Sequence, residues 1–390
     1  MTSVDRNYDI VIVGAALVGA SAAVVFAKQG FKVALVDKKN PLAQSKNVGW
    51  DSRIYAISPG NAEWLKDIGV WQHLNIERVT PIAGMKIWAD VNPEPLMFDS
   101  EDAFVNNLGY IVENSALQQA FCDELEKLDV DLLFGHEGVY VDLDQQDATL
   151  KFADGSHLKA KLMIAADGGN SWVRQQVGLT QQKIVYDHEG LVANFEVELP
   201  HQNIARQWFV DDGILAWLPL PGNRISMVFS TKHSQTLSAL SLDEFARHIA
   251  QLGSFALGKM QCITPSVAFP LVKQNASALV DIRLALVGDA AHQVHPMAGQ
   301  GVNLGFRDVF ALAKVLAERN RLADIGDRFV LRRYERARKA DVLAIQGLTH
   351  SLYGAFDSKQ MLVKMARNWG LILPNRHSIL KRVLMKHALI

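Results

Sequence analysis

The apolar positions at the start of the chain change their period twice. Residues 8–37 contain an apolar run ending at Gly14, an alanine-rich stretch with helical spacing, and a second apolar run ending at Asp37. Short apolar runs bounded by turn residues are typical of buried strands, and the stretch between them favours a helix. The pattern therefore predicts a strand–helix–strand unit.

The next part of the chain alternates between the two periods. Residues 52–70 indicate a loop and then a helix that ends at Gly69, and residues 113–128 carry apolar positions at helical spacing behind an Asn or Ser cap. Residues 82–105 alternate as strands do, and residues 130–166 predict several strands around an Asp154-Gly155 turn.

Residues 190–232 have a different pattern, with alternating segments broken by Pro and Gly. This pattern predicts an antiparallel sheet of the kind that often walls a binding pocket. We expect Trp208, Phe209, Trp217 and Leu218 to lie in the part of this sheet that covers the pocket, with a place in the ordinary core as the alternative.

The last third of the chain again combines a short apolar run, typical of a buried strand, with helical spacing. A short helix follows Ser241, residues 284–292 predict a strand that enters a turn, and the chain beyond Gly301 is predicted to be helical. Breaks are expected near Gly326, Gly347–Gly354 and Pro374. The strand–helix–strand unit is thus interrupted by a sheet domain and completed late.

The fold class that follows is α/β (α+β), with a Rossmann-like βαβ domain, an inserted antiparallel-sheet domain and C-terminal helices. The expected division has three parts of the βαβ domain, two parts of the sheet domain and one helical region. The βαβ domain is expected at 1–80, 111–180 and 276–325. The sheet domain is expected at 81–110 and 181–275, and the helical region at 326–390.

Composition limits the class of protein. The chain has 390 residues, of which 49% are hydrophobic and 21% charged, as expected of a soluble protein with two or three domains. Its two cysteines, Cys122 and Cys262, lie far apart, which disfavours a disulfide framework and a zinc site, and the scattered histidines indicate no other metal site. No secretion signal or membrane-spanning run is evident, so we expect a cytoplasmic protein without a nucleic-acid partner.

The charge is distributed unevenly. Residues 328–390 carry 13 Lys and Arg against 3 Asp and Glu, although the whole chain has a formal net charge of −1. The tail at residues 376–390 fits a basic amphipathic helix. We expect it to contact the inner face of a membrane or a partner protein, with docking on its own domain as the alternative.

Three strand-end turns carry the candidate chemistry. The first reads Gly14-Ala15-Ala16-Leu17-Val18-Gly19, which departs at Ala16 from the G-x-G-x-x-G pattern of dinucleotide-binding turns. Its position between a strand and a helix, with Asp37 at the end of the second strand, still favours a dinucleotide, because one methyl group crowds the pyrophosphate without abolishing binding.

The other two turns are Asp167-Gly168, in KLMIAADGGNSWVR, and Gly288-Asp289, in LALVGDAAHQVHPMAGQGVNLG. Either one alone is compatible with a simple strand-to-helix turn, since Asp-Gly pairs are common there. The occurrence of three such sites in this order is much harder to explain in that way.

With these motifs the sequence resembles the FAD-dependent aromatic hydroxylases typified by para-hydroxybenzoate hydroxylase, and most closely their ubiquinone-biosynthesis branch. The resemblance covers nearly the whole chain. The segments that carry it are DSRIYAIS (51–58), YIVENSALQQAF (110–121), GDAAHQVHPMAGQGVNLGFRD (288–308), LYGAF (352–356) and RNWGL (367–371).

The resemblance implies a set of cofactor contacts. Gly14, Ala16 and Gly19 form the turn at the FAD pyrophosphate, Asp37 binds the ribose, and Asp289, after Gly288, binds the ribityl chain. Further contacts are implied for Arg53 and Gln118 on the phosphate side, for Asp167 and Gly168 with both FAD and NAD(P)H, and for the backbone of Gly299, Gln300, Gly301, Val302 and Asn303 beside the flavin ring.

The implied reaction is an NAD(P)H-dependent hydroxylation. FAD is reduced by NAD(P)H and reacts with O₂ to a C4a-hydroperoxyflavin, which transfers oxygen to a polyprenylated phenol or quinol on the way to ubiquinone. His295 and Pro296 are the candidates for contacting the substrate or the hydroperoxide, with a structural role as the alternative. No other catalytic residue is assigned.

Two other functions remain open at this point. The chain could be an accessory flavoprotein with weak catalysis that acts as a scaffold in a ubiquinone-biosynthesis complex, to which Ala16 and the basic tail lend some support. A flavin-dependent halogenase or prenyl reductase on the same fold is less well supported, because the chain lacks the GWxWxIP signature of the halogenases.

Overall fold

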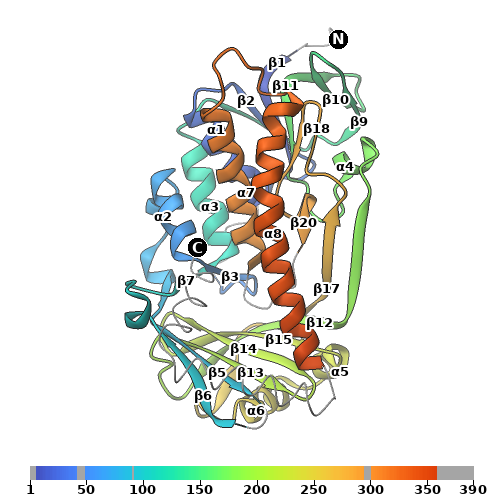
Figure 1. Cartoon of the computed structure of the whole chain (residues 1–390). Helices are drawn as coiled ribbons and strands as arrows, with labels where there is room; N and C mark the ends of the chain where they lie inside the picture. The colour runs from blue at the N-terminus through green and yellow to red at the C-terminus, as the bar shows by residue number, and fades with distance from the viewer. Residues whose placement is uncertain (1–5, 42–48, 90–91, 294–299, 358–390) are drawn as a thin grey trace.

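The strand–helix–strand unit lies at the centre of the first of two large sheets (Figure 1). The computed structural model describes residues 6–41, 49–89, 92–293 and 300–357. The first sheet runs in the order β18 (Val280–Asp281), β19 (Leu284–Leu286), β11 (His157–Ala165), β1 (Arg6–Val13), β2 (Val33–Asp37) and β8 (Val130–Phe134), and β10 (Ala148–Phe152) and β9 (Gly138–Leu143) extend it from β11. The pairs from β19 to β8 are parallel, so their carboxyl ends meet at one edge.

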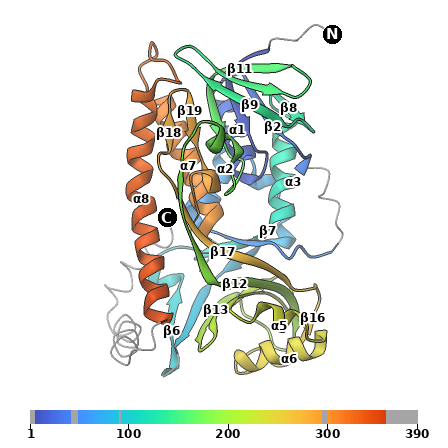
Figure 2. The same ribbon diagram turned by 90° about the vertical axis from the view of Figure 1, so that its right-hand side faces the viewer.

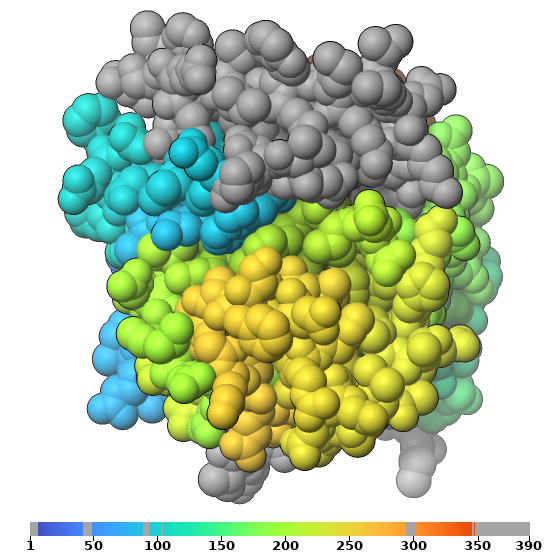
Figure 3. All heavy atoms as spheres, turned by 90° about the horizontal axis from the view of Figure 1, so that it is seen from below, coloured from blue at the N-terminus to red at the C-terminus, as the bar shows by residue number. Residues whose placement is uncertain are grey.

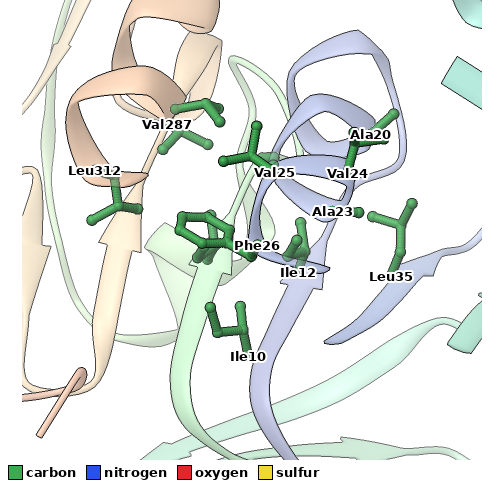
Figure 4. Close-up of a cluster of buried hydrophobic side chains, with 14 of the residues drawn as sticks. Ile10, Ile12, Ala20, Ala23, Val24, Val25, Phe26, Leu35, Val287 and Leu312 are labelled. Atoms are coloured by element: carbon green, nitrogen blue, oxygen red, sulfur yellow. The ribbon is translucent and has the colours of Figure 1, made fainter. Parts of the chain in front are cut away.

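Helices cover this sheet and form its core. They are α1 (Leu17–Lys28), α2 (Pro59–Asp67), α3 (Asn114–Leu125), α4 (Trp172–Gln176) and α7 (Gln300–Ala317). Figure 4 shows Phe26 of α1 beside Ile12 of β1 and Leu312 of α7, and all three are fully buried. Removal of this apolar surface from water holds α1 and α7 in place over the ends of β1 and β19.

The second sheet is almost entirely antiparallel, as the alternating pattern over residues 190–232 predicts. Its order is β20 (His292–Gln293), β17 (Val267–Ala276), β12 (Gln181–Val197), β15 (Arg224–Thr231), β14 (Gly213–Leu220), β13 (Ile204–Val210), β5 (Gly84–Ala89) and β6 (Asn92–Asp99), with β16 (Met260–Cys262) paired to β12. Only β13 and β5 pair in parallel among these described strands.

Two helices, α5 (Ser234–Ser238) and α6 (Leu242–Leu252), pack against the outer face of the second sheet, which Figure 3 shows from below. Trp208 and Trp217 belong to this helix-covered core, so the expectation that they cover the pocket is wrong. Successive side chains of a strand point to opposite faces, which places Phe209 and Leu218 on the inner face.

A small sheet separates the two large ones. It consists of β3 (Ile54–Ile57), β7 (Gly109–Glu113) and β4 (Thr80–Ile82). Leu218 packs in one cluster with Ile54 and Ala56 of β3, which confirms that it faces the first domain. The remaining described elements are the 3₁₀ turns η2 (Trp71–His73), η3 (Ile76–Arg78), η4 (Glu101–Ala103) and η5 (Gly288–Ala290).

The long helix α8 (Arg328–Asp357) runs alongside both sheets (Figures 1 and 2). The predicted break near Gly326 is confirmed, whereas the break expected at Gly347–Gly354 is wrong, because α8 continues through both glycines. A glycine within a helix costs about 1 kcal/mol relative to alanine, which a long helix tolerates. Pro374 lies outside the described residues. No helix in the described ranges is long and apolar enough to cross a membrane.

A buried ionic network joins α7, α8 and η5. Asp308 of α7 contacts Nε2 of His292 at 2.8 Å, accepts a hydrogen bond from Nε of Arg338 at 2.6 Å, and accepts another from the backbone N–H of Gly288 at 2.8 Å. Burial by itself raises the pKa of Asp308, but the charges and hydrogen bonds of His292 and Arg338 outweigh it and hold that pKa below its usual value. The carboxylate is therefore charged in the folded protein.

Replacing Asp308 by Asn should lower the free energy of unfolding by about 3 kcal/mol or more, because the buried guanidinium group of Arg338 loses its counter-charge. Urea unfolding followed by circular dichroism measures this change. Since the folded pKa is depressed, the stability from Asp308 is present above the unfolded pKa and is lost as the pH falls through the folded one, that is below about pH 4.

The matched control is Asp187→Asn. Asp187 pairs with Lys232 at 2.9 Å, but its side chain is 83% exposed, so this change should cost less than about 1 kcal/mol. Equal effects of the two substitutions would contradict a structural role for the buried network.

Candidate functional site

The turn between β1 and α1 has no space for larger residues at its two outer glycines. Gly14 has a φ of +102°, and a Cβ there would lie 2.4 Å from the carbonyl oxygen of Ala166. A Cβ on Gly19 would lie 1.8 Å from the carbonyl oxygen of Gly14. The first turn thus packs directly against the end of β11, and both positions require glycine.

Ala16 does not disturb this turn. It is the N-cap residue of α1, with φ −69° and ψ −179°, and it is exposed. This is extended backbone that any L-residue adopts, so the methyl group causes no backbone strain. No described side chain caps α1, and the amides of its first turn, at the positive end of the helix dipole, are suited to an anion.

Asp37 has a role that the sequence does not reveal. One carboxylate oxygen accepts a hydrogen bond from the N–H of Ala15 at 2.8 Å, and the other accepts one from the N–H of Lys39 at 2.9 Å. Asp37 therefore holds the first turn in shape. A carboxylate has about four acceptor positions, so the predicted ribose contact stays compatible with these bonds.

The second turn, Asp167-Gly168, follows β11. One oxygen of Asp167 accepts a hydrogen bond from the N–H of Val173 at 3.0 Å, whereas the other is buried without a partner among the described residues. Burial raises the pKa of this carboxyl group. A buried acceptor of this kind is rare in proteins and indicates a missing donor.

Arg174 connects the second turn to the third. Its guanidinium group is buried and donates to the carbonyl oxygens of Ala290 at 2.7 Å and Gly169 at 2.9 Å, and it also contacts Gln181. The sequence gives no signal of this role, because an arginine after a turn is ordinarily a surface residue.

The third turn, Gly288-Asp289, lies at the end of the neighbouring strand β19. A Cβ on Gly288 would lie 3.2 Å from the side chain of Val18 in α1, and a Cβ on Gly305 in α7 would lie 2.5 Å from the same side chain. The third turn, α1 and α7 thus meet at Val18. Asp308 also holds Gly288 in place by accepting a hydrogen bond from its backbone N–H.

Arg53 and Asp289 both act electrostatically on Tyr55. The guanidinium group of Arg53 is 5.7 Å from the centre of the Tyr55 ring. Burial raises the pKa of Tyr55, Arg53 opposes the shift, and the charge of Asp289 adds to it. Asp289 itself is exposed and accepts a hydrogen bond from Gln293 at 2.9 Å.

The start of α7 is held by Asn303. This buried side chain accepts hydrogen bonds from the N–H of Ser58 at 3.0 Å and the amide of Asn61 at 2.8 Å, and it donates to the carbonyl oxygen of Ala56 at 2.7 Å. Its side chain thus fixes β3 and α2 to α7, and its backbone carbonyl oxygen accepts a further hydrogen bond from the amide of Asn61 at 3.3 Å.

The remaining predicted residues are placed as follows. Gln300, Gly301 and Val302 form the first turn of α7, and Gln118 is half-buried on α3, which packs beside α1. Gly299, His295 and Pro296 lie outside the described residues. The structure therefore brings the three turns together at the carboxyl edge of β1, β11 and β19, where open α/β sheets bind their ligands.

Comparison with known proteins agrees with this arrangement. The family model described as FAD binding domain matches residues 7–346. The ubiquinone hydroxylase UbiL of Rhodospirillum rubrum is 35% identical over 393 residues, covering 99% of this chain and 90% of that protein. The 3-demethoxyubiquinol 3-hydroxylase of Escherichia coli K12 is 34% identical over 388 residues, covering 98% of each chain.

Among solved structures, the p-nitrophenol 4-monooxygenase PnpA of Pseudomonas putida DLL-E4 superposes with a TM-score of 0.79 over 99% of both chains. At 19% identity this likeness shows the shared fold alone. The family model and the two relatives cover nearly the whole chain, including all three turns. The chain belongs to the FAD-dependent hydroxylases of ubiquinone biosynthesis, within the flavin monooxygenases.

Proposed function

We propose that this enzyme uses NAD(P)H and O₂ to hydroxylate the ring of a polyprenylated phenol or quinol that is a precursor of ubiquinone. The relatives named for ubiquinone hydroxylation support the substrate class. The observation that carries the proposal is the meeting of three strand-end turns at one edge of the sheet. A Cβ on Gly14 of the first turn would lie 2.7 Å from the N of Asp167 in the second turn, and Val18, which follows the first turn, lies against Gly288 of the third turn and Gly305 of α7.

The donor groups at this edge fit FAD. The first turn and the uncapped start of α1 present backbone N–H groups, which suit a pyrophosphate. The unpartnered oxygen of Asp167 can accept a hydrogen bond from a hydroxyl or an amide. When bound, FAD supplies the transfer of one oxygen atom from O₂ to an electron-rich ring, with electrons from NAD(P)H.

In this proposal each turn has one task. The first turn, through Gly14, Ala16 and Gly19, binds the pyrophosphate, and Asp37 binds the ribose. Asp289 binds the ribityl chain, with Arg53 beside it. The backbone at the start of α7, from Gly299 to Asn303, lies beside the ring, because the positive end of a helix dipole stabilises a negative charge.

The other predicted site residues are given roles by their place in the fold or in the sequence. Asp167 and Gly168 serve both dinucleotides, and Gln118 reaches the phosphate side from α3. His295 and Pro296 stay candidates for contact with the substrate. The second sheet, whose outer face is covered by α5 and α6, encloses the ring on its inner face and excludes water, which such oxygen transfer requires.

Association with a membrane or a biosynthetic complex is a further part of the proposal. In α8 the side chains of Arg328, Arg332, Arg333 and Arg336 are exposed, which suits an anionic surface. The tail at residues 376–390 lies outside the described residues, and its role as a basic amphipathic helix stays a prediction.

The first test compares two substitutions in one turn. Gly19→Ala should weaken FAD retention by about tenfold or more, corresponding to ~1.4 kcal/mol, because the added Cβ forces the turn open. Ala16→Gly should retain FAD at least as well as the unmodified protein, since Ala16 is exposed and unstrained. The measurement is flavin fluorescence released on dilution, with far-UV circular dichroism as the control for folding. Weaker retention in Ala16→Gly would contradict the account of this turn.

The second test separates catalysis from a scaffold role. Purified enzyme with FAD should oxidise NAD(P)H faster when a short-chain prenylated phenol is added, and mass spectrometry should find a product heavier by one oxygen. This result is expected because bound substrate directs the reaction toward the ring instead of toward peroxide. Absence of both stimulation and product, in a protein that retains FAD, would favour the accessory flavoprotein.

A further inference from the structure

The inner face of the second sheet can be reconstructed from strand register. Gln207 of β13 pairs with Ala216 of β14 and with Ile87 of β5, and Ala216 pairs in turn with Val228 of β15. Val228 pairs with Val192 of β12. Residues directly opposite one another in a sheet point to the same face, so these five side chains form one row across five strands. We call it the Gln207 row.

Two neighbours of Gln207 show which face this is. Trp208 follows it and packs in the core under α6. Ala205, two positions earlier, packs with Ile54 and Ala56 of the first domain. Because alternate residues of a strand share a face, Gln207 points toward the first domain, where the three turns and the loop of Arg53 lie.

The Gln207 row contains a single polar residue. Its four other members, Ile87, Ala216, Val228 and Val192, are apolar and half-buried, so they retain surface that other side chains do not cover. Gln207 is only 6% exposed. Within the described part of the chain, no hydrogen bond or ion pair joins its amide to another group. Its amide atoms are also not among the described buried polar atoms that lack a partner, so the amide keeps its remaining contact with solvent, which a ligand can replace.

We propose that Gln207 is the residue that recognises the ring oxygen of the substrate, and that the apolar members of the row hold the ring and the beginning of its chain. The inference rests on the proposed function, since it takes an oxygenated aromatic ring as the ligand. A glutamine amide both donates and accepts hydrogen bonds. It can therefore accept from a phenolic hydroxyl and donate to a ring carbonyl or ether oxygen at the same position.

This assignment also accounts for the choice of ligand. An aliphatic row with one amide in it suits a ligand that is mostly apolar and has few polar atoms. An amide that loses its partner in a closed site disfavours ligands without the oxygen, which makes Gln207 a specificity-determining residue. Gln207 takes no part in moving protons or electrons.

The test uses Gln207→Leu, which has a similar volume and no hydrogen-bonding group. Calorimetric titration of the FAD-loaded enzyme compares 2-prenylphenol with prenylbenzene, which lacks the ring oxygen. The unmodified enzyme should bind the phenol about fivefold or more tightly than the hydrocarbon, as one hydrogen bond in a closed site provides. Gln207→Leu should bind both ligands equally, with an undiminished affinity for prenylbenzene and an unchanged melting temperature.

The matched control is Gln182→Leu, the same substitution at an exposed position of β12, which should leave the preference for the phenol intact. The inference is overturned if Gln207→Leu keeps that preference, or if its melting temperature and both affinities fall together, as loss of a structural residue would cause. If the unmodified enzyme binds neither ligand, the proposed substrate class fails, and the inference fails with it.

Discussion

The contact of α1, α7 and the third turn at Val18 is the constraint on which the rest of the molecule depends. A Cβ on Gly305 would lie 2.5 Å from Val18 and one on Gly288 would lie 3.2 Å from it, while Gly14 packs against Ala166 at the end of β11. The ends of β1, β11 and β19 therefore depend on glycine for their close approach. Arg174 and Asp308 then join the turns by buried, charge-assisted hydrogen bonds. The result is one edge of a sheet at which backbone amides and carboxylates from distant parts of the chain come together.

The two faces of the inserted second sheet differ in their side chains and in what covers them. Its outer face is closed by α5 and α6 and carries the largest aromatic residues, Trp208 and Trp217. Its inner face carries the Gln207 row, in which Gln207 is the one polar residue, and a neighbouring row in which Leu218 pairs with Ser226 and Ser226 with Asn194. In the function that we propose, the first domain holds the cofactor that supplies oxygen transfer, whereas the second domain contributes shape, exclusion of water and recognition of the ring.

The sequence patterns predicted the helices, strands and turns better than the tertiary contacts between their side chains. The period of the apolar residues located the βαβ unit, the antiparallel sheet and the three turns, because buried faces repeat with the geometry of their strands and helices. The face of the second sheet to which Trp208 points depends on the register of its strand. The local sequence around a tryptophan does not reveal that register. The continuity of α8 through Gly347 depends on the whole helix. The roles of Asp37 at Ala15 and of Arg174 between two turns arise from tertiary contacts that no local pattern contains.

The central claim is that the three turns form one FAD site. The most direct measurement is the flavin content of the purified full-length protein after addition of FAD and removal of the excess, with the released flavin identified by chromatography. We expect one FAD per chain in the unmodified protein and in Ala16→Gly, and a clearly lower content in Gly305→Ala, in which the new Cβ would lie 2.5 Å from the side chain of Val18. A folded protein that retains no FAD, or a Gly305→Ala variant with full flavin content, would contradict it.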